Sequence, residues 1–317
     1  MARRWIILPG VKRRPPHAQR GGARLEEELL VIRKLSALSG RNRKLDGGIM
    51  FGGTPRLSWA GWIAPDHNNQ IDLASRGLLV QEDGRNILVL AGAEALLAPP
   101  PRTCRCQRHA PGLLDSLAQH GLGEGDIHAV VLTHLHALLP DELAEALRDG
   151  DMPRLLFPAA RYLAGERHWF RARHPHPRDR GLFVPQLLRR LESSGRLELL
   201  DSPTSELLGS GWHFHVSDGY TPGQLLPEIA MPGGPVLFAG DLIPGIHWLK
   251  LEITTSYDSS PEHLIAEKER LLDDLVASRG RLFLTRDPGV AMVKVMRDRQ
   301  SRYLPFDQCS AFSSLDR

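Results

Sequence analysis

The sequence predicts an α/β (α+β) protein in which β-sheets are covered by helices. Short apolar runs broken by Asp-Gly or Gly, as in RGLLVQEDGRNILVLAG at residues 76–92, predict strands joined by tight turns. PEHLIAEKERLLDDLVAS at residues 261–278 has apolar residues at a period of about 3.6, which predicts an amphipathic helix. Strand-like and helix-like segments alternate along the chain, and this order favours sheets packed against helices.

The remaining elements follow from the same patterns. We expect strands at 29–38, 127–136, 154–158, 196–200, 212–220, 234–241 and 281–288, and further helices at 109–122, 184–195 and from Pro140 onward. The first helical turn after Pro140 would carry Asp141 and Glu142, whose negative charges suit a helix start. No long linker divides residues 30–317, so a single domain is expected there.

Composition limits the class of protein. The chain has 317 residues, of which 42% are hydrophobic and 24% charged, in the ordinary range for a soluble globular protein. No stretch reaches the roughly 20 apolar residues of a membrane-spanning helix, and no secretory signal is visible, so we expect a cytoplasmic protein without membrane partners. Cys104, Cys106 and Cys309 form no CxxC pair, which predicts free thiols.

The first residues differ from the rest. Residues 1–24 carry seven Arg or Lys and no acid, within a segment rich in Pro and Gly. Such a segment buries little, so residues 1–29 are predicted to be a basic, disordered extension ahead of a domain at 30–317. Electrostatic binding to nucleic acid is the alternative, but no nucleic-acid-binding motif accompanies the basic residues, so a nucleic-acid partner is not expected.

Two histidines at the end of a buried strand draw attention to VLTHLHALLPDEL, residues 131–143. A loop at a strand end can turn His134 and His136 toward one point, and neutral imidazole is a common ligand of zinc, iron and manganese. His-x-His alone is weak evidence. It recurs in WHFHV at 212–216 and in HPHP at 174–177, where histidines without a functional role are the simpler interpretation. The Arg- and His-rich stretch 161–180 has two possible interpretations. It could line the mouth of a pocket and attract an anionic ligand, or it could be a solvated helix and loop.

Several longer motifs give His134 and His136 a context. LDGGIMFGGTPRLSW, RGLLVQEDGRNILVLAG, VVLTHLH, DGYTPGQLLPEI, VLFAGD, YDSSPEHLIAEKERLL and LTRDP resemble, in order and spacing, motifs of the metallo-β-lactamase-fold hydrolases, and most closely their lactonase-like branch. The resemblance covers nearly all of residues 30–295. It implies an αββα four-layer sandwich with the active site at one edge, where strand-end loops meet. In active relatives, histidines and aspartates there bind two metals that activate a water.

The resemblance also implies that this chain has lost part of that metal site. His134 and His136 match metal ligands, and Asp241 matches the bridging carboxylate, which would be the catalytic residue. At the other ligand positions, Leu138 replaces an aspartate and Leu139, Tyr220 and Arg286 replace histidines. Leu90 replaces a supporting aspartate, and Thr133 keeps its place beside the first ligand.

Two functions follow, and both remain open at this point. One is a catalytically impaired homologue that binds a small-molecule ligand in the cleft or acts as a regulator. The other is a one-metal hydrolase of an ester-, lactone- or thioester-like bond, in which His134, His136 and Asp241 hold the ion. The cofactor is therefore at most one divalent metal (zinc, iron or manganese), or none. Without metal, Asp241 would be a partly buried carboxylate lacking a cation, so we expect Arg286 to pair with it. The alternative is that Arg286 is a surface arginine with no such role.

Overall fold

A computed structural model describes residues 32–97, 112–137 and 154–316. Several expectations fall outside these ranges: the disordered extension at 1–29, the free thiols of Cys104 and Cys106, the helix from Pro140, and the side chains of Leu138 and Leu139. Cys309 is a free cysteine, as expected.

The first of two six-stranded sheets contains the predicted hairpin at residues 76–90. Its strands lie in the order β1 (Arg33–Ser39), β4 (Arg76–Glu82), β5 (Arg85–Leu90), β6 (Ala129–Leu132), β7 (Arg161–Gly165) and β8 (Leu197–Leu200). Asp83 and Gly84 join β4 to β5 at positive φ of 47° and 71°, a turn that suits the right-handed twist of paired strands. From β5 to β8 the strands are parallel, so their carboxyl ends share one edge.

The second sheet has the order β14 (Tyr303–Cys309), β13 (Met292–Arg297), β12 (Arg281–Phe283), β11 (Val236–Phe238), β10 (Gln224–Ile229) and β9 (Trp212–Ser217). Among the pairs of neighbouring strands described in this sheet, β11 and β12 are parallel and the other pairs are antiparallel. A separate two-stranded ribbon pairs β2 (Arg43–Asp46) with β3 (Gln70–Leu73).

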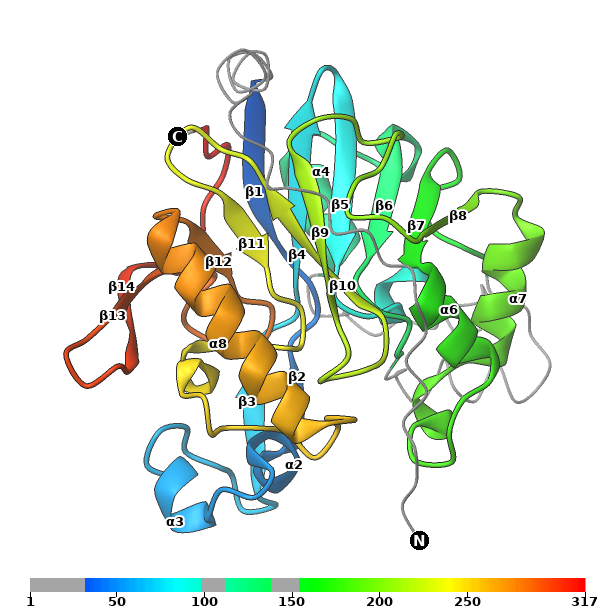
Figure 1. The fold of residues 1–317 in the computed structure, drawn as a ribbon. Coiled ribbons are helices and arrows are strands. Elements are labelled where there is room, and N and C mark those ends of the chain that lie inside the picture. Colours follow the sequence, from blue (N-terminus) through cyan, green and yellow to red (C-terminus); the bar gives the residue numbers. More distant parts are fainter. Residues whose placement is uncertain (1–31, 98–111, 138–153, 317) are drawn as a thin grey trace, which may run out of the picture.

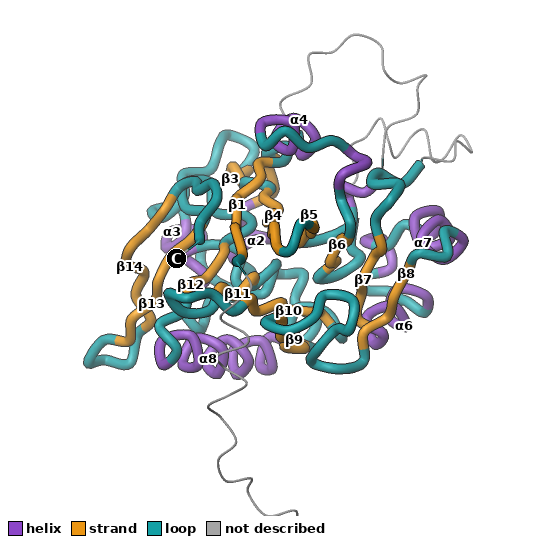
Figure 2. The backbone as a smooth tube through the Cα atoms, turned by 90° about the horizontal axis from the view of Figure 1, so that it is seen from above, coloured by secondary structure: helices purple, strands orange, loops and turns teal. Residues whose placement is uncertain are grey.

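Helices cover the outer faces of both sheets. They are α4 (Leu113–Gln119), α6 (Glu166–Arg173), α7 (Pro185–Ser193) and α8 (Pro261–Ala277). Two short helices, α2 (Gly47–Phe51) and α3 (Arg56–Trp59), lie beside the ribbon instead, and short 3₁₀ turns occur at Glu94–Leu96, Glu124–Asp126, Arg180–Leu182 and Ile246–Leu249. Figure 1 shows α8 lying along the second sheet and α6 and α7 beside β7 and β8. In Figure 2, α4 and α8 lie on opposite sides of the two rows of strands.

Three apolar cores correspond to the three interfaces between layers. Phe238 and Phe283 stack between the two sheets with Val80 and Leu35 of the first sheet. A second core lies under α4 and α7, and a third lies under α8, whose buried leucines have the predicted period. The expected αββα sandwich is therefore confirmed. Within the described ranges, no helix has the length and apolar character needed to span a bilayer.

Several elements differ from the sequence expectations, which did not include the ribbon of β2 and β3, α2 or α3 and gave a helix at α6 as only one of two alternatives. The strand expected at 154–158 is wrong: Leu155 makes only an isolated bridge with Leu97, and Phe157 has a positive φ of 62°. These residues are apolar because they fill the core beside α7, and the strand is β7, which begins at Arg161. The hairpin of β13 and β14 extends the second sheet beyond the last strand that we expected.

Candidate functional site

The site begins where two parallel strands of the second sheet end. β11 and β12 pair in register, with Phe238 opposite Phe283. Asp241 and Arg286 each lie three residues beyond this pair, so both emerge at the same sheet edge. The backbone of Arg286 is held on both sides, since its N–H donates to the carbonyl of Pro244 and its carbonyl accepts from Ala74.

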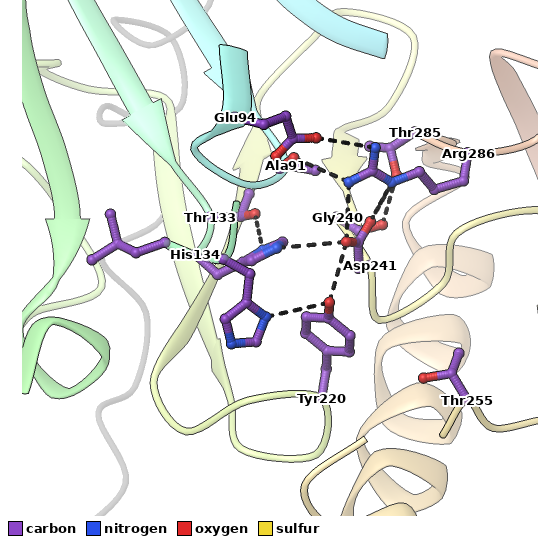
Figure 3. A network of polar contacts seen from close by, with 12 residues as sticks. Ala91, Glu94, Thr133, His134, Tyr220, Gly240, Asp241, Thr255, Thr285 and Arg286 are labelled. Carbon is purple, nitrogen blue, oxygen red and sulfur yellow. Dashed lines mark hydrogen bonds and ion pairs between the residues drawn. The ribbon is translucent and has the colours of Figure 1, made fainter. Parts of the chain in front are cut away.

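Arg286 forms an ion pair with Asp241, as the sequence predicted. Its Nε lies 2.9 Å from Oδ1 and its Nη2 lies 3.2 Å from Oδ2 (Figure 3), so each carboxylate oxygen receives one guanidinium N–H. Both side chains are largely buried, with exposed fractions of 9% and 14%. A two-point contact of this kind is among the strongest charge-assisted hydrogen bonds that a carboxylate can make.

Asp241 has further neighbours on both oxygens. The Thr285 hydroxyl lies 3.5 Å from Oδ1, while the Tyr220 hydroxyl and Nε2 of His134 lie 3.4 Å and 3.5 Å from Oδ2. Burial by itself would raise the pKa of the Asp241 carboxyl, but the charge and the hydrogen bonds of Arg286 hold it well below its usual range. Asp241 is therefore ionised at neutral pH and already surrounded by donors.

His134 follows β6 and is buried between Thr133 and Asp241. Its Nδ1 lies 2.9 Å from the Thr133 hydroxyl, and its Nε2 faces Asp241. Burial lowers the pKa of His134, so the ring is neutral. A neutral ring satisfies both neighbours when the hydroxyl donates to Nδ1 and the Nε2–H donates to the carboxylate. The supporting role expected for Thr133 stays a prediction; the structure shows its contact with His134.

His136 is also buried and lies among aromatic rings. Its Nδ1 is 3.5 Å from the Tyr220 hydroxyl, its ring packs edge-on against Phe183 at 4.8 Å, and its Nε2 has no hydrogen-bond partner among the described residues. Burial and the neighbouring His134 and His168 keep its pKa well below the usual value. Burial also raises the pKa of Tyr220, so the phenol stays protonated. Tyr220 thus links His136 to Asp241 by two long polar contacts.

A second acid extends the charge network. Oε1 of Glu94 lies 3.4 Å from Nη1 of Arg286 and 3.1 Å from Nη2 of Arg43. The result is a chain of alternating charges that runs from Arg43 through Glu94 and Arg286 to Asp241. Two cations and two anions are present, so the network is balanced.

The residues described do not fit a divalent metal. Such an ion needs deprotonated donors with lone pairs turned toward one point. Both oxygens of Asp241 accept from Arg286, the Tyr220 phenol is protonated, and a permanent cation lies at the edge where an ion would bind. Over residues 32–97, 112–137 and 154–316, no group of three or more His, Cys, Asp or Glu side chains is arranged to hold a metal. Leu138 and Leu139 lie outside these ranges.

Two small adjoining pockets open at this edge. The first spans about 270 Å³, part of which is open solvent, and is lined by Arg43, Glu94, His134, His136, Leu182, Tyr220, Asp241, Tyr257 and Arg286. The second has about 380 Å³ and adds Leu45, Met50, Leu73, Pro244 and Thr255 to five residues that it shares with the first. The first pocket is therefore lined mainly by polar residues, the second is partly lined by apolar ones, and Arg43 and Tyr257 belong to both.

Some of the residues in this site were predicted from the sequence motifs, and others were not. His134, His136, Tyr220, Asp241 and Arg286 come together as the motifs implied. Leu90 does not reach the polar network, because its side chain packs in the apolar core under α4.

Among the residues that the sequence did not indicate, Arg43, Glu94 and Tyr257 line the cleft. Glu94 had one available signal, since it lies only four residues beyond the end of a strand. The second His-x-His pair, His213 and His215, lies on edge strand β9 and contributes to neither pocket. From the Arg- and His-rich stretch 161–180, His168 is buried in the core.

Comparison with known proteins places the fold. No protein-family model matches the chain, and no curated protein matches it by sequence. Among solved structures, a probable metal-dependent hydrolase from Staphylococcus aureus is similar, with a TM-score of 0.69 and 22% identity over 87% of this chain and 98% of that one.

Two further structures have a TM-score of 0.65, and each match covers 86% of this chain and 94% of the other. One is AidC, a dizinc quorum-quenching lactonase in complex with a product, at 19% identity; the other is AbOPH, a hydrolase in the beta lactamase superfamily, at 16%. At such low identity the likeness is one of fold. The two mixed sheets, their outer helices and these matches identify the chain as a protein with the metallo-β-lactamase fold.

Proposed function

We propose that this protein is a catalytically impaired homologue of metallo-β-lactamase-fold hydrolases whose cleft binds a small molecule without a metal ion. The observation that carries this proposal is the two-point ion pair of Arg286 with Asp241. The guanidinium supplies, within the protein, the positive charge that a carboxylate at this depth requires. It offers neither a Lewis acid nor a bound water, so the chemistry that a metal supplies is absent from this proposal.

The surroundings support the same conclusion. His134, His136 and Tyr220 are held in a network of contacts to Asp241, and all three side chains are neutral because burial shifts their pKa values away from the charged forms. A partly buried cleft with balanced charges and an adjoining, partly apolar pocket is typical of a small-molecule binding site.

A one-metal hydrolase is the second candidate. It is favoured by the closeness of His134 and His136, whose ring centroids are 5.1 Å apart, and by Nε2 of His136, which has no partner among the described residues. In that case Asp241 would have to exchange Arg286 for the ion. His134, His136 and Asp241 would hold the ion, which would supply an activated water for an ester-, lactone- or thioester-like substrate.

Turnover separates the two candidates. The protein, purified without chelator and then supplied with zinc, manganese or iron, is assayed with a lactone, an aryl ester, a thioester and a phosphodiester. We expect hydrolysis no faster than that of the His134→Ala variant. Turnover that depends on the added metal and disappears in His134→Ala would establish the hydrolase and overturn the proposal.

A further inference from the structure

Two side chains in the wall shared by both pockets keep polar groups available. Five residues line both pockets, and three of them (Tyr220, Asp241 and Arg286) direct their polar atoms at one another. Arg43 makes one contact, from Nη2 to Glu94 at 3.1 Å, and the Tyr257 hydroxyl has no hydrogen bond within the described part of the chain. Most N–H donors of the Arg43 guanidinium are thus available to a ligand.

The available groups are mainly donors. Burial raises the pKa of Tyr257, so its phenol keeps its proton and donates at neutral pH. Arg43 and Tyr257 both line the two adjoining pockets, so they face the same space. A planar guanidinium beside a hydroxyl matches the two oxygens of a carboxylate, which accept parallel N–H bonds from the guanidinium fork.

The charge balance favours a single negative charge in the ligand. Arg43 and Arg286 are offset by Glu94 and Asp241, so a monoanion brings a modest excess of negative charge. A phosphate dianion would bring twice that excess near the same two acids, and like charges repel. The remaining space of the second pocket is lined by Leu45, Met50, Leu73 and Pro244, against which a hydrocarbon group can pack.

We propose that the ligand is a small monocarboxylic acid with a short apolar chain. Its carboxylate binds between the Arg43 guanidinium and the Tyr257 hydroxyl, and its chain lies against Leu45 and Met50. This inference rests on the proposed function of the cleft as a binding site, and it adds the chemical class of the ligand and the residues that select it.

The test uses a matched pair of probes, hexanoate and the neutral hexanamide, with inorganic phosphate as a third. Binding to the full chain is measured by isothermal titration calorimetry. We expect hexanoate to bind at least about 10-fold more tightly than hexanamide or phosphate, the factor typical of one charge-assisted hydrogen bond. Arg43→Gln is expected to lose this preference, and Tyr257→Phe to weaken hexanoate binding severalfold.

Lys44→Gln is the control. Lys44 is the next residue on β2, also loses a positive charge when substituted, and pairs with Asp66 and Asp72 outside the cleft. The Lys44→Gln variant should bind hexanoate as tightly as the unaltered chain. A thermal melt of each variant without ligand shows whether that variant is folded.

Each outcome bears on one claim. Equal binding of hexanoate and hexanamide, tighter binding of phosphate, or hexanoate binding that survives Arg43→Gln would overturn the carboxylate assignment, as would no binding of any probe. None of these binding results measures metal-dependent turnover. The proposal of a metal-free homologue is therefore tested separately, by the turnover assay.

Discussion

The guanidinium of Arg286 contacts both carboxylate oxygens of Asp241, at 2.9 Å and 3.2 Å, where the ends of two parallel strands meet. The pair is largely buried, and removing one partner of a buried ion pair leaves the other charge without compensation. The four-membered network that includes Glu94 and Arg43 therefore depends on Arg286 as its central cation.

Arg286→Met is expected to lower the free energy of unfolding by about 3–5 kcal/mol, because Asp241 would keep its buried charge without a partner. Adding Asp241→Asn should recover part of the loss, so the two effects will not be additive. Urea denaturation of the two single variants and the double variant measures the coupling. Arg302→Met removes a surface pair with Asp298 and should change stability little. Additive effects at Arg286 and Asp241 would contradict a coupled pair.

Replacing the cation and the phenol by imidazoles should create zinc affinity. Tyr220→His combined with Arg286→His frees Asp241 and adds two nitrogen donors near His134 and His136. We expect the double variant to bind zinc at least about 10-fold more tightly than the unaltered chain, as two new ligands imply, and Tyr220→His alone to gain little. Competition with a chromophoric chelator gives the affinities. Equal affinity in the unaltered chain and the double variant would show that Arg286 does not block the ion.

His168 should make stability depend on pH. It is fully buried, its Nε2 accepts from the backbone N–H of Leu135, and its Nδ1 donates to the carbonyl of Pro222. Burial lowers its pKa to about 3, from about 6.5 in an unfolded chain. Between pH of about 6.5 and about 3, the unfolded chain binds a proton that the folded chain does not. As the pH falls through this range, this group therefore lowers the free energy of unfolding by up to about 1.4 kcal/mol per pH unit.

His168→Gln provides the comparison, since an amide can both accept from Leu135 and donate to Pro222 without titrating. The free energy of unfolding is measured by urea denaturation from pH 7.5 to pH 4.5. The variant should show a shallower decline than the unaltered chain. Parallel curves would mean that His168 does not contribute to the acid sensitivity.

Lys268 should hold the segment that leads to Tyr257. Its side chain is fully buried on α8, and Nζ donates to the carbonyls of Lys250, Leu251 and Ile253 at 2.8–3.3 Å. Lys268→Met leaves three carbonyls without this donor, so we expect a loss of about 3 kcal/mol or more and faster amide hydrogen exchange across residues 250–258.

The control for Lys268→Met is Lys294→Met, which breaks a partly exposed ion pair with Asp307 and should cost less than about 1 kcal/mol. Exchange at 250–258 that is no faster in Lys268→Met than in Lys294→Met would show that the ammonium does not anchor this segment.

Local patterns predicted the elements that depend on local chemistry. The hairpin between β4 and β5 follows from Asp83 and Gly84, which accept positive φ, and α8 follows from the spacing of its leucines. The strand expected at 154–158 failed because an apolar run does not distinguish a strand from a turn that fills a core. β14 contains Pro305 and several exposed residues, as edge strands often do, and gave little periodic signal.

The site was predictable only in part, for a similar reason. Motif positions identified Asp241 and Arg286, and the need of a buried carboxylate for a cation predicted their pairing. Arg43 and Glu94 could not be found in this way, because they are 51 residues apart in sequence and Glu94 is 192 residues from Arg286. Their contact depends on how the chain brings the ribbon of β2 and β3 next to the turn that follows β5, which tertiary structure alone determines.

Metal content tests the central claim most directly. The protein is purified without chelator, dialysed against buffer containing zinc and then against buffer without it, and its metals are counted by inductively coupled plasma mass spectrometry beside the His134→Ala variant. If Arg286 takes the place of the cation, both proteins will retain far less than one ion per chain. One or more zinc ions per unaltered chain, lost in His134→Ala, would contradict the account.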